Sequence, residues 1–273
     1  MKSTMIRSGL STALALASVA LAPAQSGLPT TQPKRLTIIR EHIKPGMGAA
    51  HARNEAGWPA AFAKANSPGY YLALTSMTGT PQAWFLVTHD SHAAEAAAMK
   101  RDAKDPVLSA ELDRLAQADG EFLTGYDVVQ TVGRPDLSLG KFPEAGKMRF
   151  FEVLFFSVRQ GKEATMDEIM KTYADVRKRV SPDASYRVYT VQAGMPDPTY
   201  VVFVSVADYA EFDRLQAEHN KVFEVATKEE HAVFAKWGEA VFRSENSRFR
   251  VDAGMSYVSK EVRAADPDFW MPK

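Results

Sequence analysis

The chain has 273 residues, of which 45% are hydrophobic and 24% charged, enough for one large core or two modest ones and too apolar for a wholly disordered chain. Its 33 Lys and Arg balance 33 Asp and Glu, so no basic surplus is present to hold a phosphate backbone, and we expect no nucleic acid partner. The absence of cysteine excludes disulfides, thiolate metal sites and a cysteine nucleophile.

Residues 1–24 have the pattern of a secretory signal peptide. Lys2 and Arg7 precede an apolar run at residues 10–21, and Ala22-Pro23-Ala24 offers the small residues of a cleavage site. The run is shorter than the roughly 20 residues that span a bilayer, so an uncleaved anchor is the lesser alternative. We therefore expect an exported protein, periplasmic or secreted, with no membrane span after cleavage.

A first structural unit is predicted at residues 35–138, after a polar, proline-containing flexible lead at residues 25–34. Its expected elements, in chain order, are a strand at 36–43, a helix at 48–65 kinked by Pro59, hairpin strands at 70–77 and 83–89, helical sequence from Ser91 broken at Asp105-Pro106, and a strand at 126–132.

A second unit is predicted at residues 148–259, after a linker at residues 139–147 and before a C-terminal tail at residues 260–273. Its expected elements are a strand at 149–158, a helix at 165–180, hairpin strands at 185–193 and 199–206, helical sequence from Asp208 to Trp237, and a strand at 249–258.

The two units share a register as well as an order of elements. Five residues of the first unit recur in the second unit 115 positions later. The pairs are Gly46 and Gly161, Tyr71 and Tyr186, Thr75 and Thr190, Gly79 and Gly194, and Pro81 and Pro196. Matches at one offset that also follow the order of the elements predict an internal duplication. Each repeat has the order β-α-β-β-α-β, which is the ferredoxin-like arrangement.

The strand sequence at residues 148–158, MRFFEVLFFSV, is apolar on both faces. Helices cover only one face of a ferredoxin-like sheet, so the other face needs a second cover. We predict an α+β fold in which the two repeats pair their sheets into a barrel, a pseudo-dimer within one chain.

This pattern resembles the dimeric α+β barrel superfamily. That superfamily includes antibiotic-biosynthesis-type monooxygenases, NIPSNAP-like proteins, EthD-like proteins and haem-binding chlorite-dismutase-like proteins. The resemblance covers residues 35–259 and depends on element order and hydrophobic pattern, so no single family's catalytic residues carry over to this sequence.

A ligand site is expected between the two sheets, where an apolar space would hold a few polar groups. A buried carboxylate or histidine there would have a shifted pKa and could transfer a proton. For each candidate, an ion pair at a strand edge or a place in the core remains the alternative. The candidates are Arg40, His42, Trp84, His89, Glu152, Arg187 and Tyr189.

No metal or cofactor site is predicted. His51 and Glu55 stand four residues apart on a helix, but without a second such pair the sequence favours a surface contact over a metal site. His219 and His231 lie in charged helical sequence and are expected on a solvated face, so no histidine is indicated as an axial ligand for haem.

The favoured function is the binding of a small apolar or aromatic molecule between the sheets. An alternative is a cofactor-independent, monooxygenase-like oxidoreductase that acts on a phenol or quinol. A third is an interaction module in which the cluster Phe269-Trp270-Met271 docks a partner, although packing of this cluster onto the barrel is favoured. The sequence leaves open whether the chain forms a homo-oligomer.

Overall fold

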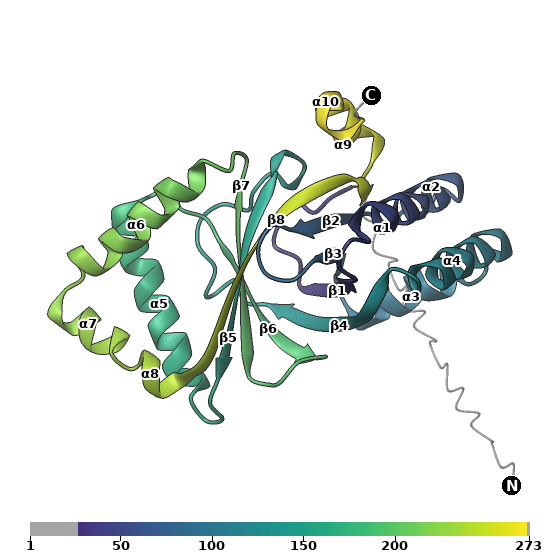
Figure 1. Cartoon of the computed structure of the whole chain (residues 1–273). Coiled ribbons are helices and arrows are strands. Elements are labelled where there is room, and N and C mark those ends of the chain that lie inside the picture. Colours follow the sequence, from purple (N-terminus) through teal and green to yellow (C-terminus); the bar gives the residue numbers. More distant parts are fainter. Residues whose placement is uncertain (1–26, 272–273) are drawn as a thin grey trace, which may run out of the picture.

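Eight strands close into an antiparallel barrel at the centre of the computed structural model, which describes residues 27–271 (Figure 1). The order around the barrel is β1-β3-β2-β8-β5-β7-β6-β4, and β4 pairs back with β1. This confirms the predicted α+β barrel. The expected signal peptide at residues 1–24 falls outside the described residues and stays a prediction.

The first half of the chain follows the predicted order. Its elements are β1 (Arg35–Ile43), α1 (Gly48–Glu55), α2 (Gly57–Lys64), β2 (Tyr71–Ser76), β3 (Gln82–His89), α3 (His92–Asp102), α4 (Pro106–Asp119) and β4 (Leu123–Gly133). Pro59 has no amide to donate to the carbonyl of Glu55, four residues earlier, and α1 ends at that residue. Ser91 and Asp105 accept backbone amides at the starts of α3 and α4, as their positions predict.

The second half repeats this order and adds a tail. Its elements are η1 (Ala145–Lys147), β5 (Phe150–Val158), α5 (Glu163–Val180), β6 (Arg187–Ala193), β7 (Thr199–Val206), α6 (Glu211–Val225), α7 (Lys228–Phe234), α8 (Trp237–Ala240), β8 (Val241–Tyr257), α9 (Lys260–Ala265) and α10 (Pro267–Trp270). The last barrel strand begins at Val241, eight residues before the predicted strand at 249–258. Its first part pairs with β5 but is polar and largely exposed, so the apolar pattern did not predict it.

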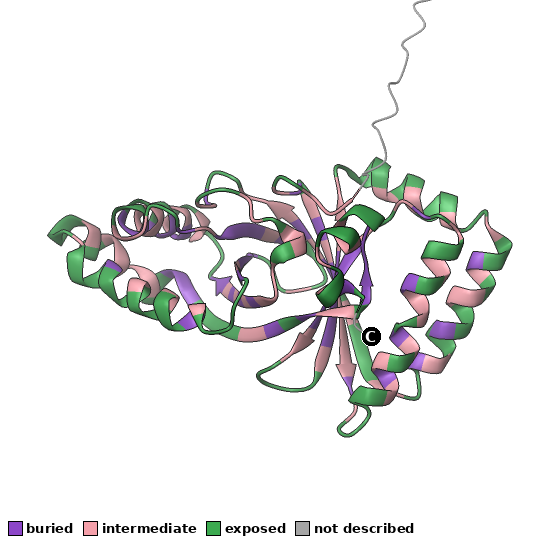
Figure 2. Cartoon of the chain, turned by 90° about the horizontal axis from the view of Figure 1, so that it is seen from above, coloured by how far each residue is buried: buried purple, intermediate pink, exposed green. Residues whose placement is uncertain are grey.

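The two halves have the same topology. Their strand orders are β4-β1-β3-β2 and β8-β5-β7-β6, and the β2–β8 and β4–β6 pairs join them into one barrel. The starts of β1 and β5, the ends of these strands, and the starts of α1 and α5 each lie 115 residues apart. The helices of the two halves lie on opposite sides of the barrel (Figure 2).

The barrel interior is one apolar core built from both halves. Phe151, Val153 and Phe155 of β5 point into this core, whereas Leu154 and Phe156 of the same strand pack under the helices of the second half. The two apolar faces of this strand are therefore covered by the opposite sheet and by helices, as the sequence predicts.

Segments outside the strands close the end of the barrel where β1 and β5 begin. Leu28, from the predicted lead, packs on the barrel core. Trp270 is 5% exposed, and its Nε1 donates to the carbonyl of Gly146 at 3.1 Å. The guanidinium carbon of Arg149 lies 3.7 Å from the ring centre of Phe269. Phe269 and Trp270 thus pack on the barrel, which was the favoured interpretation of this cluster.

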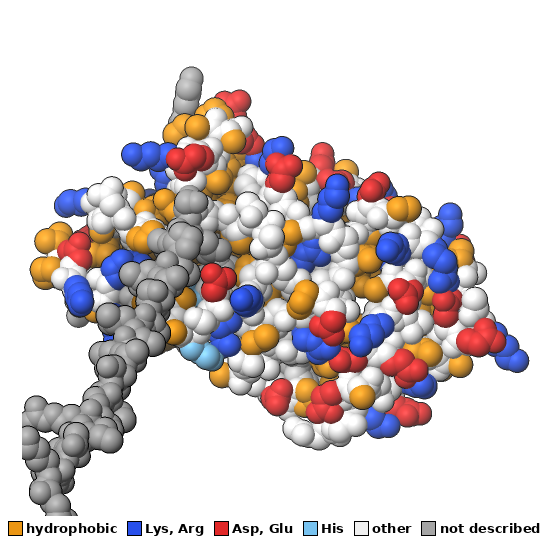
Figure 3. Space-filling view, turned by 180° about the vertical axis from the view of Figure 1, so that it is seen from behind, with side chains coloured by type: hydrophobic (Ala, Val, Ile, Leu, Met, Phe, Trp, Pro, Cys, Tyr) orange, Lys and Arg blue, Asp and Glu red, His pale blue; other side chains and the backbone are white. Residues whose placement is uncertain are grey.

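The surface carries both signs of charge. Acidic and basic side chains are intermixed over the face shown in Figure 3, in keeping with a formal net charge of zero. Between residues 27 and 271, none of the helices combines the length and apolar character needed to cross a bilayer.

The hairpin turns offer a matched test of the β4–β6 pairing between the halves. Gly79 and Gly194 hold equivalent turns with φ of +75° and +90°. A Cβ at Gly79 would meet nothing within 4 Å, whereas at Gly194 it would lie 1.9 Å from the carbonyl oxygen of Val128 in β4. We expect Gly79→Ala to lower the free energy of unfolding by about 1 kcal/mol, and Gly194→Ala to lower it by at least about 3 kcal/mol. Urea unfolding checks both, and equal losses would contradict the close approach.

Candidate functional site

A cavity of about 550 Å³ lies in the second half, between the outer face of the sheet and α5, α6, α7 and α8. Its volume falls within the range typical of small-molecule sites. A smaller hollow of about 80 Å³ lies at the end of the barrel that the tail closes. A water molecule takes about 30 Å³ of liquid, so this second space suits only a few waters. The larger of the two spaces thus lies beneath the helices.

The wall of the cavity is mainly apolar and aromatic. The rings of Phe156 and Trp237 meet edge to face with centroids 4.9 Å apart. Such a wall favours a flat, apolar ligand. Representative lining residues are Leu154, Phe156, Met166, Met170, Phe223 and Trp237.

Two residues that line the cavity each carry a buried polar atom with no hydrogen-bond partner among the described residues: Oη of Tyr186 and Nη1 of Arg177. Burial raises the pKa of Tyr186, so its hydroxyl stays a donor. The other terminal nitrogen of Arg177 donates to Oε2 of Glu218 at 2.5 Å, which fixes the guanidinium. An unpartnered buried donor costs about 1–3 kcal/mol, so both atoms are suited to meet an acceptor oxygen on a ligand.

A tyrosine–histidine pair joins the helices across the cavity. Oη of Tyr173 on α5 lies 2.9 Å from Nδ1 of His219 on α6. Burial, and then the positive charge of Arg177, lower the pKa of His219, so at neutral pH this imidazole is uncharged. Nε2 of His219 makes no hydrogen bond within the described part of the chain, and in the tautomer whose Nδ1–H donates to Oη of Tyr173 this nitrogen has the free lone pair and can accept a proton.

Glu152, a candidate from the sequence, also lines the cavity. Its Oε1 accepts from Nδ2 of Asn246 at 3.0 Å and from Nε of Arg248 at 3.4 Å. The guanidinium carbon of Arg248 in turn lies 4.4 Å from the ring centre of Phe212. The carboxylate is thus satisfied by its β8 neighbours and belongs to the polar part of the cavity wall.

The corresponding space in the first half is filled. Phe62 of α2 stacks with Tyr257 at 5.7 Å and contacts Tyr71 edge to face at 6.0 Å, with Trp58 beside it. The residues 115 positions after Trp58 and Phe62 are Tyr173 and Arg177. A tyrosine and an extended, ion-paired arginine replace two packed rings, and the second half keeps an open cavity.

Arg187 and Tyr189 line the smaller hollow at the barrel end. Arg187 Nη1 donates to the carbonyls of Leu139 and Tyr186 at 2.5 and 2.6 Å, and Nη2 donates to Gly140 at 3.0 Å. This arginine holds the linker against β6.

Arg40 and His42 meet at a third place, near the end of β1. Nη2 of Arg40 and Nε2 of His42 lie 3.1 and 2.8 Å from the same oxygen of Asp127. The hydrogen bond from His42 is the main cause that lowers the pKa of Asp127, with Arg40 adding to it. Trp84 packs in the barrel core, 5.9 Å from the Arg40 guanidinium.

His89 ends β3 away from these groups, and burial lowers its pKa. The structure therefore distributes the seven predicted residues over four places, and only Glu152 lies in the large cavity.

Sequence reasoning missed the residues that give the cavity its chemistry. Tyr173 was not among the candidates, and His219, which is exposed as its charged sequence predicts, also lines the cavity. A comparison of the two halves would have revealed Arg177, which stands in α5 where the first half has Phe62.

Solved structures with the same fold include a candidate monooxygenase from Fusobacterium nucleatum, with 10% identity, a TM-score of 0.53, and coverage of 80% of this chain and 91% of that one. An anthrone oxidase-like protein matches with 11% identity, a TM-score of 0.53, and coverage of 82% and 94%. A chlorite dismutase variant from Candidatus Nitrospira defluvii matches with 10% identity, a TM-score of 0.51, and coverage of 81% and 93%. The chain therefore has the ferredoxin-like dimeric α+β barrel fold. No protein-family model and no curated protein sequence matches it.

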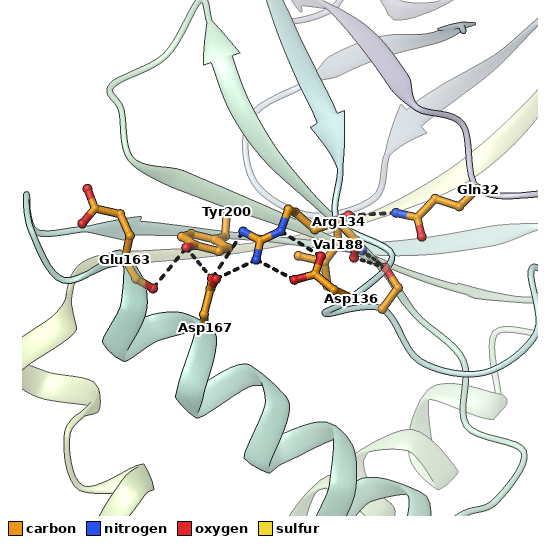
Figure 4. Close-up of polar contacts among 8 residues, drawn as sticks. Gln32, Arg134, Asp136, Glu163, Asp167, Val188 and Tyr200 are labelled. Carbon is orange, nitrogen blue, oxygen red and sulfur yellow. Dashed lines mark hydrogen bonds and ion pairs between the residues drawn. The ribbon is translucent and has the colours of Figure 1, made fainter.

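Tyr200 is a tyrosine whose hydroxyl, unlike that of Tyr186, has a hydrogen-bond partner. Oη of Tyr200 on β7 donates to Oδ1 of Asp167 at 2.7 Å, and Arg134 bridges Asp167 and Asp136 (Figure 4). This network ties the end of the first half to α5.

The two tyrosines give a paired prediction. We expect Tyr200→Phe to lower the free energy of unfolding by about 1–2 kcal/mol, because Asp167 loses a donor. Tyr186→Phe should instead raise it by about 1–3 kcal/mol, because the change removes a buried hydroxyl that has no partner. Chemical denaturation measures both, and an equal loss in Tyr186→Phe would show that this hydroxyl serves the fold.

Proposed function

We propose that this protein binds a small, flat, apolar molecule that carries a phenolic or carbonyl oxygen, in the cavity of its second half. The observation that carries the proposal is an apolar cavity of about 550 Å³ lined by two residues, Tyr186 and Arg177, that each carry a buried donor atom without a partner, Oη and Nη1. The arginine nitrogen can only donate a hydrogen bond, and the tyrosine hydroxyl keeps its proton because burial raises its pKa. The matching ligand atom is therefore an acceptor oxygen. The proposed ligand class is the one that the sequence predicts. The proposed site differs from the prediction, because it lies beneath the helices of the second half and not between the sheets.

Oxidation of that ligand by dioxygen without a cofactor is the second candidate function. It is favoured by the neutral His219, whose Nδ1 is engaged by Tyr173 and whose Nε2 can remove a proton from an acidic C–H or O–H group. For an anthrone, loss of that proton gives a carbanion that reduces dioxygen; the ring CH2 becomes a carbonyl, and the second oxygen atom leaves as water. The fold likeness to a candidate monooxygenase and an anthrone oxidase-like protein supports this candidate at the level of fold.

Haem is the cofactor implied by the resemblance of the sequence pattern to haem-binding chlorite-dismutase-like proteins. It needs an axial ligand, commonly a histidine whose other nitrogen is hydrogen-bonded. His219, with Nδ1 held by Tyr173, has that arrangement and would be the residue to hold iron. An absorption spectrum of the purified protein separates this case from the cofactor-free one, because only bound haem gives a Soret band.

We also propose that the two halves arose by internal duplication and that the protein is exported. The duplication is supported by the 115-residue offset shared by the strands and helices of the two halves. Export is supported by the sequence of residues 1–24.

Ligand binding is tested with two tyrosines on opposite faces of the second sheet. We expect calorimetry with 1-naphthol to show one site, with Tyr186→Phe weakening the affinity by about 5–10-fold through loss of one hydrogen bond. Tyr189→Phe, which alters the small barrel hollow, should bind as the wild type does. The opposite pattern would place the site between the sheets, and no saturable binding of 1-naphthol or anthrone would refute the proposal.

Oxidation is tested by oxygen uptake with anthrone. We expect His219→Gln to lower kcat by at least about 100-fold, the usual loss with a general base, while anthrone binding persists. The rate of the wild type should rise with pH through a pKa below the ordinary histidine value and then level off. His92→Gln, at a histidine that is 65% exposed, is the control and should keep full activity. Equal uptake by wild type and His219→Gln would contradict the assignment.

A further inference from the structure

Three side chains able to bind a metal ion meet between β1 and α1, on the side of the barrel away from the cavity. Nε2 of His51 lies 2.7 Å from Oε2 of Glu41, and the ligand atoms of Glu41, His51 and Glu55 all lie within 4.8 Å of one another. His51 and Glu55 are 1% and 2% exposed. The sequence-based expectation of a surface contact between them is therefore wrong, because this face of α1 packs against the sheet.

The group carries an excess of buried negative charge. Asp119, at the end of α4, is 4% exposed and adjoins Glu55. Within residues 27–271, no lysine or arginine forms an ion pair with Glu41, Glu55 or Asp119. Buried carboxylates that lack a counter-charge must either take up protons or bind a cation.

One carboxylate oxygen of Glu55 has no partner. Oε1 of Glu55 is buried and makes no hydrogen bond with any described residue. The carboxylate of Asp119, by contrast, accepts from Nδ2 of Asn54 at 2.8 Å. Glu55 thus has a carboxylate oxygen free to bind an ion, whereas Asp119 is held by Asn54 as a neighbour of the group.

We propose that Glu41, His51 and Glu55 bind one divalent first-row transition metal ion, which joins α1 to β1. One imidazole and two carboxylates form a mixed nitrogen and oxygen set that suits ions such as Zn²⁺ or Mn²⁺. Zinc bonds to such ligands are about 2.0–2.2 Å long, so ligand atoms around one ion lie no more than about 4 Å apart. The longest spacing exceeds this by less than about 1 Å, and the ion would replace the proton shared by Nε2 of His51 and Oε2 of Glu41. The site does not depend on the ligand proposed for the cavity.

The second half supplies a natural metal-free counterpart. The positions 115 residues after the three proposed ligands hold apolar residues of the cavity wall: Phe156, Met166 and Met170. The same place between strand and helix is therefore charged in one half and apolar in the other. Methionine is thus a replacement that the fold already accommodates at both helical positions.

The test uses the full chain after treatment with a chelator, titrated calorimetrically with Zn²⁺ and Mn²⁺. We expect one equivalent of at least one of these ions to bind, and Tm to rise by at least about 5 °C at a hundredfold excess over Kd. His51→Met and Glu55→Met should weaken binding by at least about 100-fold. His92→Ala, which alters an exposed His–Glu pair with His92 Nδ1 and Glu95 Oε2 3.6 Å apart, should bind as the wild type does.

A second readout keeps the test decisive if the methionine variants do not fold. Wild-type protein titrated with Co²⁺ should develop a visible absorption band that saturates at one equivalent and that Zn²⁺ displaces. The proposal is overturned if neither Zn²⁺ nor Mn²⁺ binds, if no such band forms, or if folded His51→Met binds the ion as tightly as the wild type.

Discussion

The structure depends on the burial of each sheet on both faces. β1 and β5 lie at the centres of their half-sheets and pair on both sides, so their inward side chains meet across the barrel and their outward side chains meet helices. Neither half can cover its inner face alone, because its own helices lie outside. The β2–β8 and β4–β6 pairings follow from this need and remove the open sheet edges.

The two outer layers are where the halves differ. Each has a strand–helix interface at the same register, and different side chains occupy it. In the first half, Trp58 and Phe62 fill the layer around a buried cluster of Glu41, His51 and Glu55. In the second half, methionines and an ion-paired Arg177 line an open cavity. One scaffold thus offers two chemically distinct sites, one suited to a cation and the other to an apolar ligand.

Much of the fold could be predicted from the sequence, because apolar alternation, turn residues and caps are local signals. Pro59, Ser91 and Asp105 mark helix boundaries that the structure has. The first part of β8 carries no such signal, because its side chains are polar and exposed. The site could not be predicted in the same way. An apolar strand face indicates that the face is buried, but whether a cavity remains there depends on the size of the side chains on the helix that packs against it. His219 is exposed, as its charged neighbours in sequence predict, and no local signal shows that it also lines the cavity.

The central claim is that the ligand site lies beneath the helices of the second half. A crystal structure of the protein grown with 1-naphthol tests this most directly. The account predicts electron density for the ligand in the cavity beside Trp237, with its oxygen within hydrogen-bond distance of Tyr186 Oη or Arg177 Nη1. Density in the barrel hollow beside Tyr189, with the larger cavity empty of ligand, would contradict it.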